Sequence, residues 1–186
     1  MYYHVKKFDG AWQRQVDSFG RIVEIIVTAV LLFIVPLNYS AAKQDMIIQT
    51  MVGAETAYFA DSVRNVGFIS KTMYESYLRK LDTTGHVYEI EIIHYRKTAG
   101  QLISDNGPGG YDYYYYGIYT EDILKELYQE SEDDNYYLQQ GDYISVKIKN
   151  KDKTLFTRLT EGILNRSLAV PQIEAVYGGA VKDEAG

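Results

Sequence analysis

The most informative stretch of the chain is Arg21-Ile-Val-Glu-Ile-Ile-Val-Thr-Ala-Val-Leu-Leu-Phe-Ile-Val-Pro-Leu37, a strongly apolar run with one carboxylate, Glu24, near its start. It lies near the N-terminus behind a basic segment, and no second run of its kind follows. We therefore predict a single membrane-spanning helix over residues 22–37. At about 1.5 Å of rise per residue, this span covers roughly 24 Å, which suits a thin bilayer.

Two other interpretations of this run stay open. A soluble domain can bury such a run as a core helix, and a secretory signal can be removed after it. The nearest match to a signal cleavage site is Tyr39-Ser40-Ala41-Ala42. We favour the membrane anchor because of the position of the run and the basic segment before it.

The charges around the span predict its orientation. Residues 1–21 carry four cations and two carboxylates, whereas residues 38–43 carry a single cation. Lys and Arg close to a span tend to stay on the cytoplasmic side of the membrane. We therefore expect a cytoplasmic, leader-like segment at residues 1–21 and an extracytoplasmic body after the span.

The composition narrows the classes of function. The chain has 186 residues, a formal net charge of -6 and no cysteine. A nucleic-acid partner is not expected, because phosphate binding needs a clustered Lys and Arg surface and the sequence shows no such cluster. Without cysteine there is neither a disulfide framework nor a thiolate metal site. The length suits one anchor and one small globular head.

Helical periodicity continues after the span. Apolar residues recur mostly three or four positions apart, which predicts an amphipathic helical extension over residues 38–66. We expect the whole helix to begin near Val16 and to stop at Gly67. Pro36 is expected to kink the helix or end it, because proline lacks an N–H and clashes with the preceding turn.

The remaining residues, 67–186, predict a small α/β head. Helices are expected at residues 71–81, 120–129 and 155–164. Ser70 and Thr120 are the predicted N-caps of the first two helices. Strands are expected at residues 86–96, 143–149 and 173–181. In the second strand the inward-facing residues are Ile144, Val146 and Ile148.

A loop is predicted between the first two strands of the head. Residues 98–117 contain the turn signal Asp105-Asn-Gly-Pro-Gly-Gly110, and residues 130–135 are expected to form a solvated acidic turn. The predicted fold class is therefore α+β. It consists of a long N-terminal helix, first membrane-spanning and then amphipathic, with a small head that contains an antiparallel sheet.

The N-terminal pattern resembles the type IV pilin superfamily. The segment Phe19-Gly-Arg-Ile-Val-Glu-Ile-Ile-Val-Thr-Ala-Val-Leu-Leu-Phe-Ile-Val-Pro36 is similar to the Val-Glu-Phe-Ala-Leu-Val type segment of TadE-like minor pilins. Residues 63–85 and 88–91 resemble small pilin-like proteins of Gram-positive bacteria. The resemblance covers roughly the first half of the chain. It implies a pilin-like helix and head, with Glu24 in the place of the glutamate that neutralises a neighbouring subunit's N-terminal amine.

The same resemblance raises the question of processing by a prepilin peptidase. Such enzymes cut after a glycine, and a cut after Gly20 makes Glu24 the fourth residue of the mature chain, whereas the pilin glutamate is the fifth. A cut after Phe19 restores the fifth position. Without any cut, Arg21 lies three residues before Glu24 on the same helical face and is expected to pair with it. Both alternatives stay open.

A tyrosine-rich run is the second candidate site. The run Gly109-Gly-Tyr-Asp-Tyr-Tyr-Tyr-Tyr-Gly117 supplies rigid amphipathic rings that can contact a sugar or another subunit. The plainer interpretation, which we favour, is that these rings pack on the head. The run is not a phosphate loop, because the Gly-Lys-Ser/Thr ending is missing. The candidate contact residues are Tyr111, Tyr113, Tyr114, Tyr115 and Tyr116.

Other polar clusters are assigned to solvated surface. Ser131-Glu-Asp-Asp-Asn135 lacks the Asp-x-Asp-x-Asp-Gly spacing of a calcium loop. Glu89 and Glu91 share one strand face and His94 lies on the other, which is typical of a wet strand face. The chain has neither a His-Glu-x-x-His pair nor a Gly-x-Ser-x-Gly elbow. We therefore expect no enzyme, no cofactor and no metal.

Two functions from different classes follow from these features. The first is a membrane-anchored, pilin-like (TadE-like) minor subunit or assembly component of a pilus, secretion or conjugation apparatus. Its expected partners are the lipid bilayer, other pilin-like or apparatus subunits and, if processing occurs, a prepilin peptidase. The alternative is a membrane-tethered extracytoplasmic binding module whose tyrosine-rich loop contacts an envelope polymer or glycan.

Overall fold

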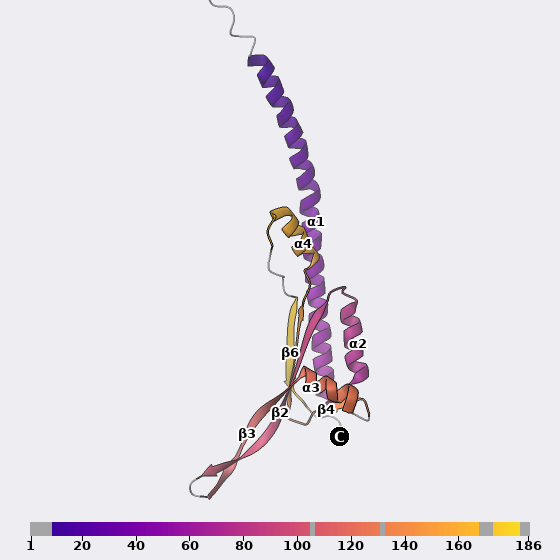
Figure 1. Ribbon diagram of the computed structural model, residues 1–186, viewed down its shortest axis with the longest axis vertical. Helices are drawn as coiled ribbons and strands as arrows, with labels where there is room; N and C mark the ends of the chain where they lie inside the picture. Colours follow the sequence, from indigo (N-terminus) through magenta and orange to yellow (C-terminus); the bar gives the residue numbers. More distant parts are fainter. Residues whose placement is uncertain (1–8, 105–106, 131–132, 168–172, 183–186) are drawn as a thin grey trace, which may run out of the picture. The chain divides into compact units, whose positions relative to one another are not determined.

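The computed structural model describes residues 9–104, 107–130, 133–167 and 173–182. The chain forms two compact units, with the division between Lys43 and Gln44. The described part of the first unit is helical, and the second unit contains the rest of the first helix and the head (Figure 1). The fold class is α+β, as predicted.

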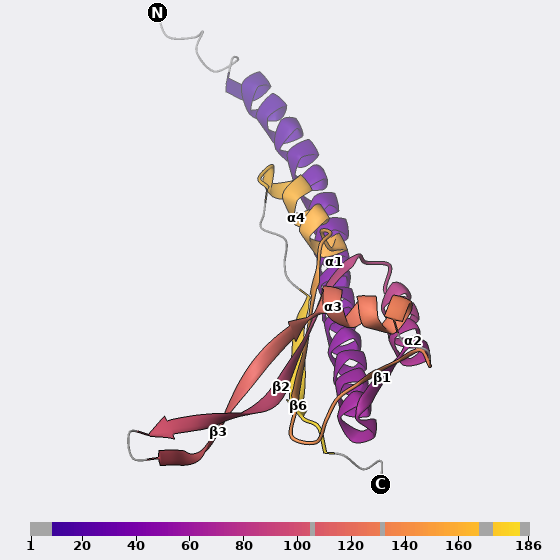
Figure 2. The same cartoon turned by 60° about the horizontal axis from the view of Figure 1, so that its bottom comes forward.

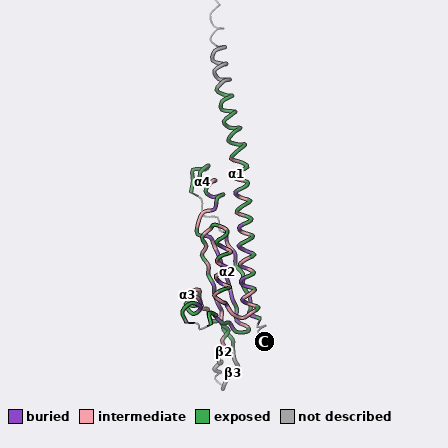
Figure 3. The backbone as a smooth tube through the Cα atoms, turned by 90° about the vertical axis from the view of Figure 1, so that its right-hand side faces the viewer, coloured by how far each residue is buried: buried purple, intermediate pink, exposed green. Residues whose placement is uncertain are grey.

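The N-terminal helix, α1 (Asp9–Val66), begins earlier than the expected start at Val16. It continues through Pro36, so the alternative in which Pro36 ends the helix is wrong. A proline removes only one ladder hydrogen bond, and Asn38 Nδ2 donates an additional bond to the Ile34 carbonyl oxygen at 3.1 Å. In the part of the chain that the structure describes, α1 is the one helix long and apolar enough to cross a membrane, and its most apolar stretch is not buried (Figure 3).

The head is built on a four-stranded antiparallel sheet in the order β3-β2-β5-β6 (Figure 1). Its strands are β2 (Tyr88–Ser104), β3 (Gly107–Tyr119), β5 (Tyr143–Asn150) and β6 (Glu174–Ala180). The central strand β5 alternates as predicted, because Ile144, Val146 and Ile148 are fully buried and the residues between them are more exposed.

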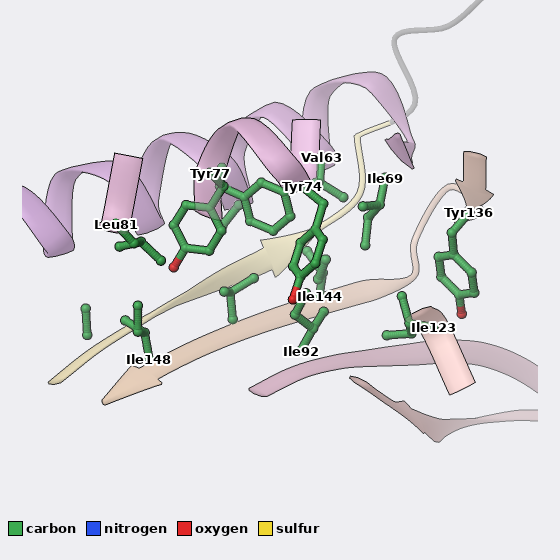
Figure 4. Close-up of a cluster of buried hydrophobic side chains, with 14 of the residues drawn as sticks. Val63, Ile69, Tyr74, Tyr77, Leu81, Ile92, Ile123, Tyr136, Ile144 and Ile148 are labelled. Carbon is green, nitrogen blue, oxygen red and sulfur yellow. The ribbon is translucent and has the colours of Figure 1, made fainter. Parts of the chain in front are cut away.

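Two helices cover the buried face of this sheet. The outer part of α1 contributes Val52, Phe59 and Val63, all buried. It is joined by α2 (Lys71–Asp82), whose buried residues are Tyr74, Tyr77 and Leu81 (Figure 4). The rings of Phe59 and Tyr77 stack with centroids 4.7 Å apart. One continuous apolar core therefore joins both helices to the sheet.

A second, two-stranded sheet was not predicted. It pairs β1 (Phe68–Ser70) with β4 (Asn135–Tyr137) and buries Ile69 and Tyr136. Strands of three residues carry too little alternation to be recognised from sequence. The predicted cap at the end of β1 is confirmed, since Ser70 Oγ accepts a hydrogen bond from the Met73 N–H at 3.1 Å.

The predicted cap at Thr120 is wrong. The helix α3 (Thr120–Lys125) has Tyr119 as its N-cap, without a side-chain bond. The Thr120 hydroxyl instead accepts a bond from the Ile92 N–H at 2.7 Å and donates to the Ile92 carbonyl at 3.2 Å. The Thr120 hydroxyl is therefore bonded to strand β2 and does not cap α3. A π-helical turn, η1 (Glu126–Glu130), follows.

The remaining helix, α4 (Leu155–Leu164), has the predicted bounds. It begins after Thr154, whose hydroxyl accepts a hydrogen bond from the Thr157 N–H at 3.4 Å. The last predicted strand is also present, as β6. Of the expected acidic turn at residues 130–135, positions 131 and 132 lie outside the described residues, and Asn135 begins β4.

The predicted loop at residues 98–117 is wrong, because this segment forms a β-hairpin. β2 continues to Ser104 and pairs with β3 along most of its length, with a register shift between Gln101 and Ile103. β5 pairs with β2 only as far as Tyr95, so the hairpin continues beyond the rest of the sheet as a two-stranded arm (Figure 2). Tyrosine favours strands. Residues 107–110 of the predicted turn signal belong to β3, and positions 105 and 106 lie outside the described residues.

Two glycines give a matched test of the head. A β-carbon on Gly178 in β6 would overlap the backbone carbonyl oxygen of Ile144, whereas one on Gly162 in α4 would meet no atom within 4 Å. We expect Gly178→Ala to lower the free energy of unfolding by about 1–3 kcal/mol. Gly162→Ala is expected to raise it by about 0.5–1 kcal/mol. Urea unfolding of the full chain in detergent, followed by circular dichroism, measures both, and equal effects would contradict the close approach at Gly178.

Candidate functional site

The first unit exposes a continuous apolar surface. Twelve large apolar side chains between residues 19 and 37 are exposed. They are Phe19, Ile22, Val23, Ile25, Ile26, Val27, Val30, Leu31, Leu32, Phe33, Val35 and Leu37. Soluble proteins rarely expose so much contiguous apolar surface, and this surface is consistent with a membrane span or a signal sequence.

Arg21 and Glu24 interrupt this apolar surface. Both are exposed, and together with Ile25 and Thr28 they line a shallow depression on α1. Within the described residues, their side chains form no ion pair with each other, although they lie one turn apart. The Glu24 side chain is exposed and therefore available to a partner.

The remaining predicted assembly and processing residues also lie on the exposed helix. Phe19, Gly20 and Pro36 are all part of α1 and exposed. A β-carbon added at Gly20 would meet no atom within 4 Å. The described fold therefore does not require a glycine at this position.

In the second unit, α1 has two different faces. One face is buried in the core of the head, through residues such as Val52, Phe59 and Val63. The other exposes Ile47, Met51, Ala54 and Tyr58 at successive spacings of four, three and four residues. This spacing keeps side chains on one stripe of a helix and is typical of helix–helix contact. The stripe is flanked by Lys80, whose Nζ lies 4.8 Å from the centroid of the Tyr58 ring.

The tyrosines of β3 lie along the two-stranded arm. Tyr113, Tyr114, Tyr115 and Tyr116 are each between 54% and 61% exposed. Because successive residues of a strand point to opposite faces, Tyr113 and Tyr115 lie on one face and Tyr114 and Tyr116 on the other. The rings are therefore presented to the surroundings and not packed into the core. For Tyr111 the structure gives the backbone pairing with Gln101, and its side chain lies outside the described residues.

Two local contacts hold tyrosines along the arm. The Lys97 Nζ lies 4.3 Å from the centroid of the Tyr113 ring, which is a cation–π contact. The Tyr114 ring covers Gly100, where an added β-carbon would lie 3.2 Å from the ring. An aromatic ring over a glycine on the neighbouring strand is a known way to stabilise a weak strand position.

A buried polar network at the base of the arm was missed by sequence reasoning. The His94 Nε2 lies 2.8 Å from Asp142 Oδ2, and the His94 Nδ1 lies 2.7 Å from the Tyr136 hydroxyl. All three side chains are at most 1% exposed. A neutral imidazole satisfies this geometry if Nε2–H donates to the carboxylate and Nδ1 accepts the hydroxyl proton. The available signal was the position of His94 on the buried face of a strand, where a polar group requires partners.

The network joins separate parts of the head. Asp142 also accepts hydrogen bonds from the N–H groups of Lys97 and Gln139, each at 2.8 Å. Burial opposes ionisation of Asp142, but these two bonds and the bond to His94 outweigh it and hold the pKa of Asp142 below its ordinary value. Burial lowers the pKa of His94, although Asp142 acts in the opposite direction. Since none of the three groups reaches the surface, the network is structural.

The outer face of the sheet carries ion pairs, as expected for a wet face. Lys149 lies 2.9 Å from Glu89, and Lys147 lies 3.2 Å from Glu174. Glu91 is exposed and His94 is buried on the opposite face. Among the residues that the structure describes, no group of three or more His, Asp or Glu side chains is placed to hold a metal ion.

Comparisons with protein-family models, with curated proteins and with solved structures find no match to this chain. Its architecture is nevertheless pilin-like, with a long apolar N-terminal helix followed by a head that contains an antiparallel sheet.

The His94 network predicts a pH dependence of stability. The folded pKa of His94 lies below the ordinary value of about 6.5, so the unfolded chain binds a proton first as the pH falls. Above the ordinary pKa of about 6.5, His94 is neutral in both states and its contribution to stability is complete. Below this pH, we expect the free energy of unfolding to decrease by up to about 1.4 kcal/mol per pH unit. The lowered pKa of Asp142 adds a further loss only near its own, more acidic range.

Urea unfolding of the full chain in detergent between pH 7.5 and 5 measures this slope. His94→Gln should flatten it, because the titrating group is removed. His86→Gln is the matched control, since His86 pairs with Asp152 at 2.8 Å but is not part of the network. A slope that His94→Gln leaves unchanged would show that other groups cause the pH dependence.

Proposed function

We propose that this chain is a membrane-anchored, pilin-like subunit of a pilus, secretion or conjugation apparatus. It acts by helix packing and protein–protein contact, without catalysis and without a cofactor. Residues 22–37 span the membrane, residues 38–66 extend the helix, and residues 67–186 form an extracytoplasmic head. The observation that carries the proposal is the exposed apolar surface of the first unit.

The energetics favour a bilayer as the environment of this surface. Removing the twelve exposed apolar side chains from water is worth on the order of 10 kcal/mol. A charged residue costs about 3 kcal/mol at the centre of a bilayer and less near its edge. Glu24 lies close to the start of the span, so the apolar gain exceeds the cost of its charge.

The polar residues at the start of the span support a role in assembly. Glu24 is exposed and has no ion-pair partner within the described residues, so a cation of a neighbouring subunit can pair with it. Gly20 costs about 1 kcal/mol relative to alanine within a helix. No described contact requires this glycine, which leaves the position open to processing or to the close approach of another helix.

The exposed stripe of α1 in the head supports lateral packing. The stripe consists of Ile47, Met51, Ala54 and Tyr58, and its spacing is typical of a surface that a second helix covers. The excess of cations before the span supports an orientation with the N-terminus in the cytoplasm.

A second candidate function is a membrane-tethered binding module for an envelope polymer or glycan. It is favoured by the exposure of Tyr113, Tyr114, Tyr115 and Tyr116 on the arm. Glycan-array binding by the detergent-solubilised chain, lost when these four tyrosines are replaced by serine, would support it. No binding to any envelope polymer would count against it.

The membrane anchor is tested by extraction of native membranes. We expect the full chain to stay in the membrane after washing with alkaline carbonate, because the span is held by apolar burial. Intact mass and N-terminal sequencing of the same material show whether a cut follows Phe19, Gly20 or neither. Release into the wash, or a mature chain that begins after the apolar run, would exclude the anchor and favour a secretory signal.

The role of Glu24 is tested by photo-cross-linking to partner subunits in membranes. Glu24→Ala should reduce the cross-linked fraction about tenfold, which corresponds to about 1.4 kcal/mol for a lost charge pair. Thr28→Ala is the matched control, because Thr28 lies one turn later on the same face of α1. Equal association of both variants and the unchanged chain would exclude a role of Glu24 in register.

A further inference from the structure

The arm of the head ends in an unpaired sheet edge. β3 is the first strand in the order β3-β2-β5-β6, so one of its two edges has no neighbouring strand. The opposite edge of the sheet is different, because α1 covers β6. The Gln49 side chain donates to the Glu174 carbonyl at 2.7 Å, and Arg64 Nε donates to the Ala180 carbonyl at 3.1 Å. Among the described elements, β3 receives no comparable cover along the arm (Figures 1 and 2).

The backbone groups that face this edge can be identified. The Ile92 N–H is bonded to Thr120, on the β3 side of β2, and the Lys97 N–H is bonded to Asp142, on the β5 side. Strand residues direct their N–H and C=O groups alternately to the two sides. The residue opposite Lys97 is Tyr115, so Tyr115 points its N–H and C=O away from β2. The same holds for Tyr113 and Gly117.

The edge is blocked at one end only. The Tyr113 N–H is already bonded to the Asp112 carboxylate at 2.9 Å. In the described structure the N–H groups of Tyr115 and Gly117 have no such partner. From Tyr113 to Tyr119 the strand has neither a charged residue nor a proline. Natural proteins usually protect sheet edges with charges, prolines or bulges, so an edge without them is suited to pairing.

The arm itself also needs a further partner for stability. Beyond Tyr95 it consists of two strands, and its tyrosines are exposed on both faces. A two-stranded hairpin in water is marginally stable at best, and a third strand stabilises it. A strand added at the free edge of β3 would supply both backbone bonds and a neighbouring row of side chains.

We propose that the free edge of β3 pairs antiparallel with β3 of a second copy of this chain, about a two-fold axis at Tyr115. This places Tyr115 opposite Tyr115 of the second copy, and Gly117 opposite Tyr113 of the second copy. All of these residues direct their N–H and C=O groups to the edge, so the ladder bonds of both strands match once the Tyr113 N–H exchanges its bond to Asp112 for one to the Gly117 carbonyl oxygen of the second copy. The contact is isologous and closes as a dimer.

The side chains of β3 suit this pairing with itself. On one face, Tyr113 of the second copy covers Gly117, as Tyr114 covers Gly100 within the chain. On the other face, Tyr116 meets Tyr114 of the second copy, and aromatic pairs stabilise neighbouring strands.

The charges of the arm also permit close approach of two copies. The whole chain carries a net charge of -6, which opposes contact between most of its faces. The edge from Tyr113 to Tyr119 is uncharged, and the adjacent Arg96 and Lys97 are exposed cations that can lie over tyrosine rings. From Tyr113 to Tyr119 the strand itself therefore adds no charge that would oppose the approach of a second acidic chain.

Single cysteines test the pairing, because the chain has no cysteine of its own. Directly opposed residues in an antiparallel ladder have Cα atoms about 5.5 Å apart, within disulfide range. Tyr115→Cys in the detergent-solubilised full chain should therefore form a disulfide dimer with copper–phenanthroline as oxidant. Tyr114→Cys is the matched control, since its two copies lie on a diagonal of about 7–8 Å. We expect Tyr115→Cys to cross-link at least tenfold faster.

The double variant Tyr114→Cys with Tyr116→Cys restores opposed cysteines and should cross-link as Tyr115→Cys does. Tyr115→Pro provides a measurement without oxidation. Its missing N–H faces the free edge and not β2, so the intrachain ladder keeps its bonds. We expect Tyr115→Pro to convert the dimer to monomer in analytical ultracentrifugation, with Tyr115→Phe as the control that stays dimeric.

Three results would overturn the inference. The first is equal cross-linking of Tyr114→Cys and Tyr115→Cys, and the second is a monomeric unchanged chain. The third is an adduct whose mass is not twice that of the chain, which would assign the edge to a different protein. None of these results depends on the membrane anchor. Retention of the same chain in carbonate-washed membranes reports separately on the proposed function.

Discussion

The packing of α1 on one face of the sheet is the constraint on which the rest of the head depends. Val52, Phe59 and Val63 are buried in the core that joins α1 and α2 to the sheet, and the Phe59 ring stacks on Tyr77. The same helix closes the β6 edge through Gln49 and Arg64. Since one helix covers one edge, the other edge of the sheet, at β3, is left to any partner that the head binds. The asymmetry between the two edges follows directly from this packing.

The buried His94 network lies at the point where the sheet narrows to the arm. Asp142 binds His94 and the Lys97 N–H just beyond the place where β5 stops pairing with β2. A carboxylate there replaces the strand partner that β2 loses, because it accepts the N–H that β5 no longer reaches. The network thus provides a firm base for a hairpin that has no third strand beyond it. Because burial lowers the pKa of His94, the network requires a neutral histidine, and the head is less stable at acidic pH.

Local sequence patterns predicted those elements that depend only on residues close together in the sequence. The helix at residues 155–164 and the cap at Ser70 depend on neighbours within one turn, and both are confirmed. The alternation in β5 is confirmed for the same reason. The hairpin at residues 98–117 was missed, because a run of tyrosines and glycines becomes a strand only when β2 lies beside it. Thr120 failed as a cap because Ile92, distant in sequence, engages its hydroxyl.

The sequence by itself determined that the chain has one long apolar helix followed by an α+β head, because apolar runs and side-chain periodicity act within a single element. It also set the candidate residues Glu24 and Tyr113 to Tyr116, since residue type alone marks a charge in an apolar run and a cluster of rings. Only the tertiary structure decided that those rings stand on a two-stranded arm, that His94 is buried beside Asp142, and that β3 has a free edge. Each of these depends on strand order and register, which arise from contacts between residues far apart in the chain.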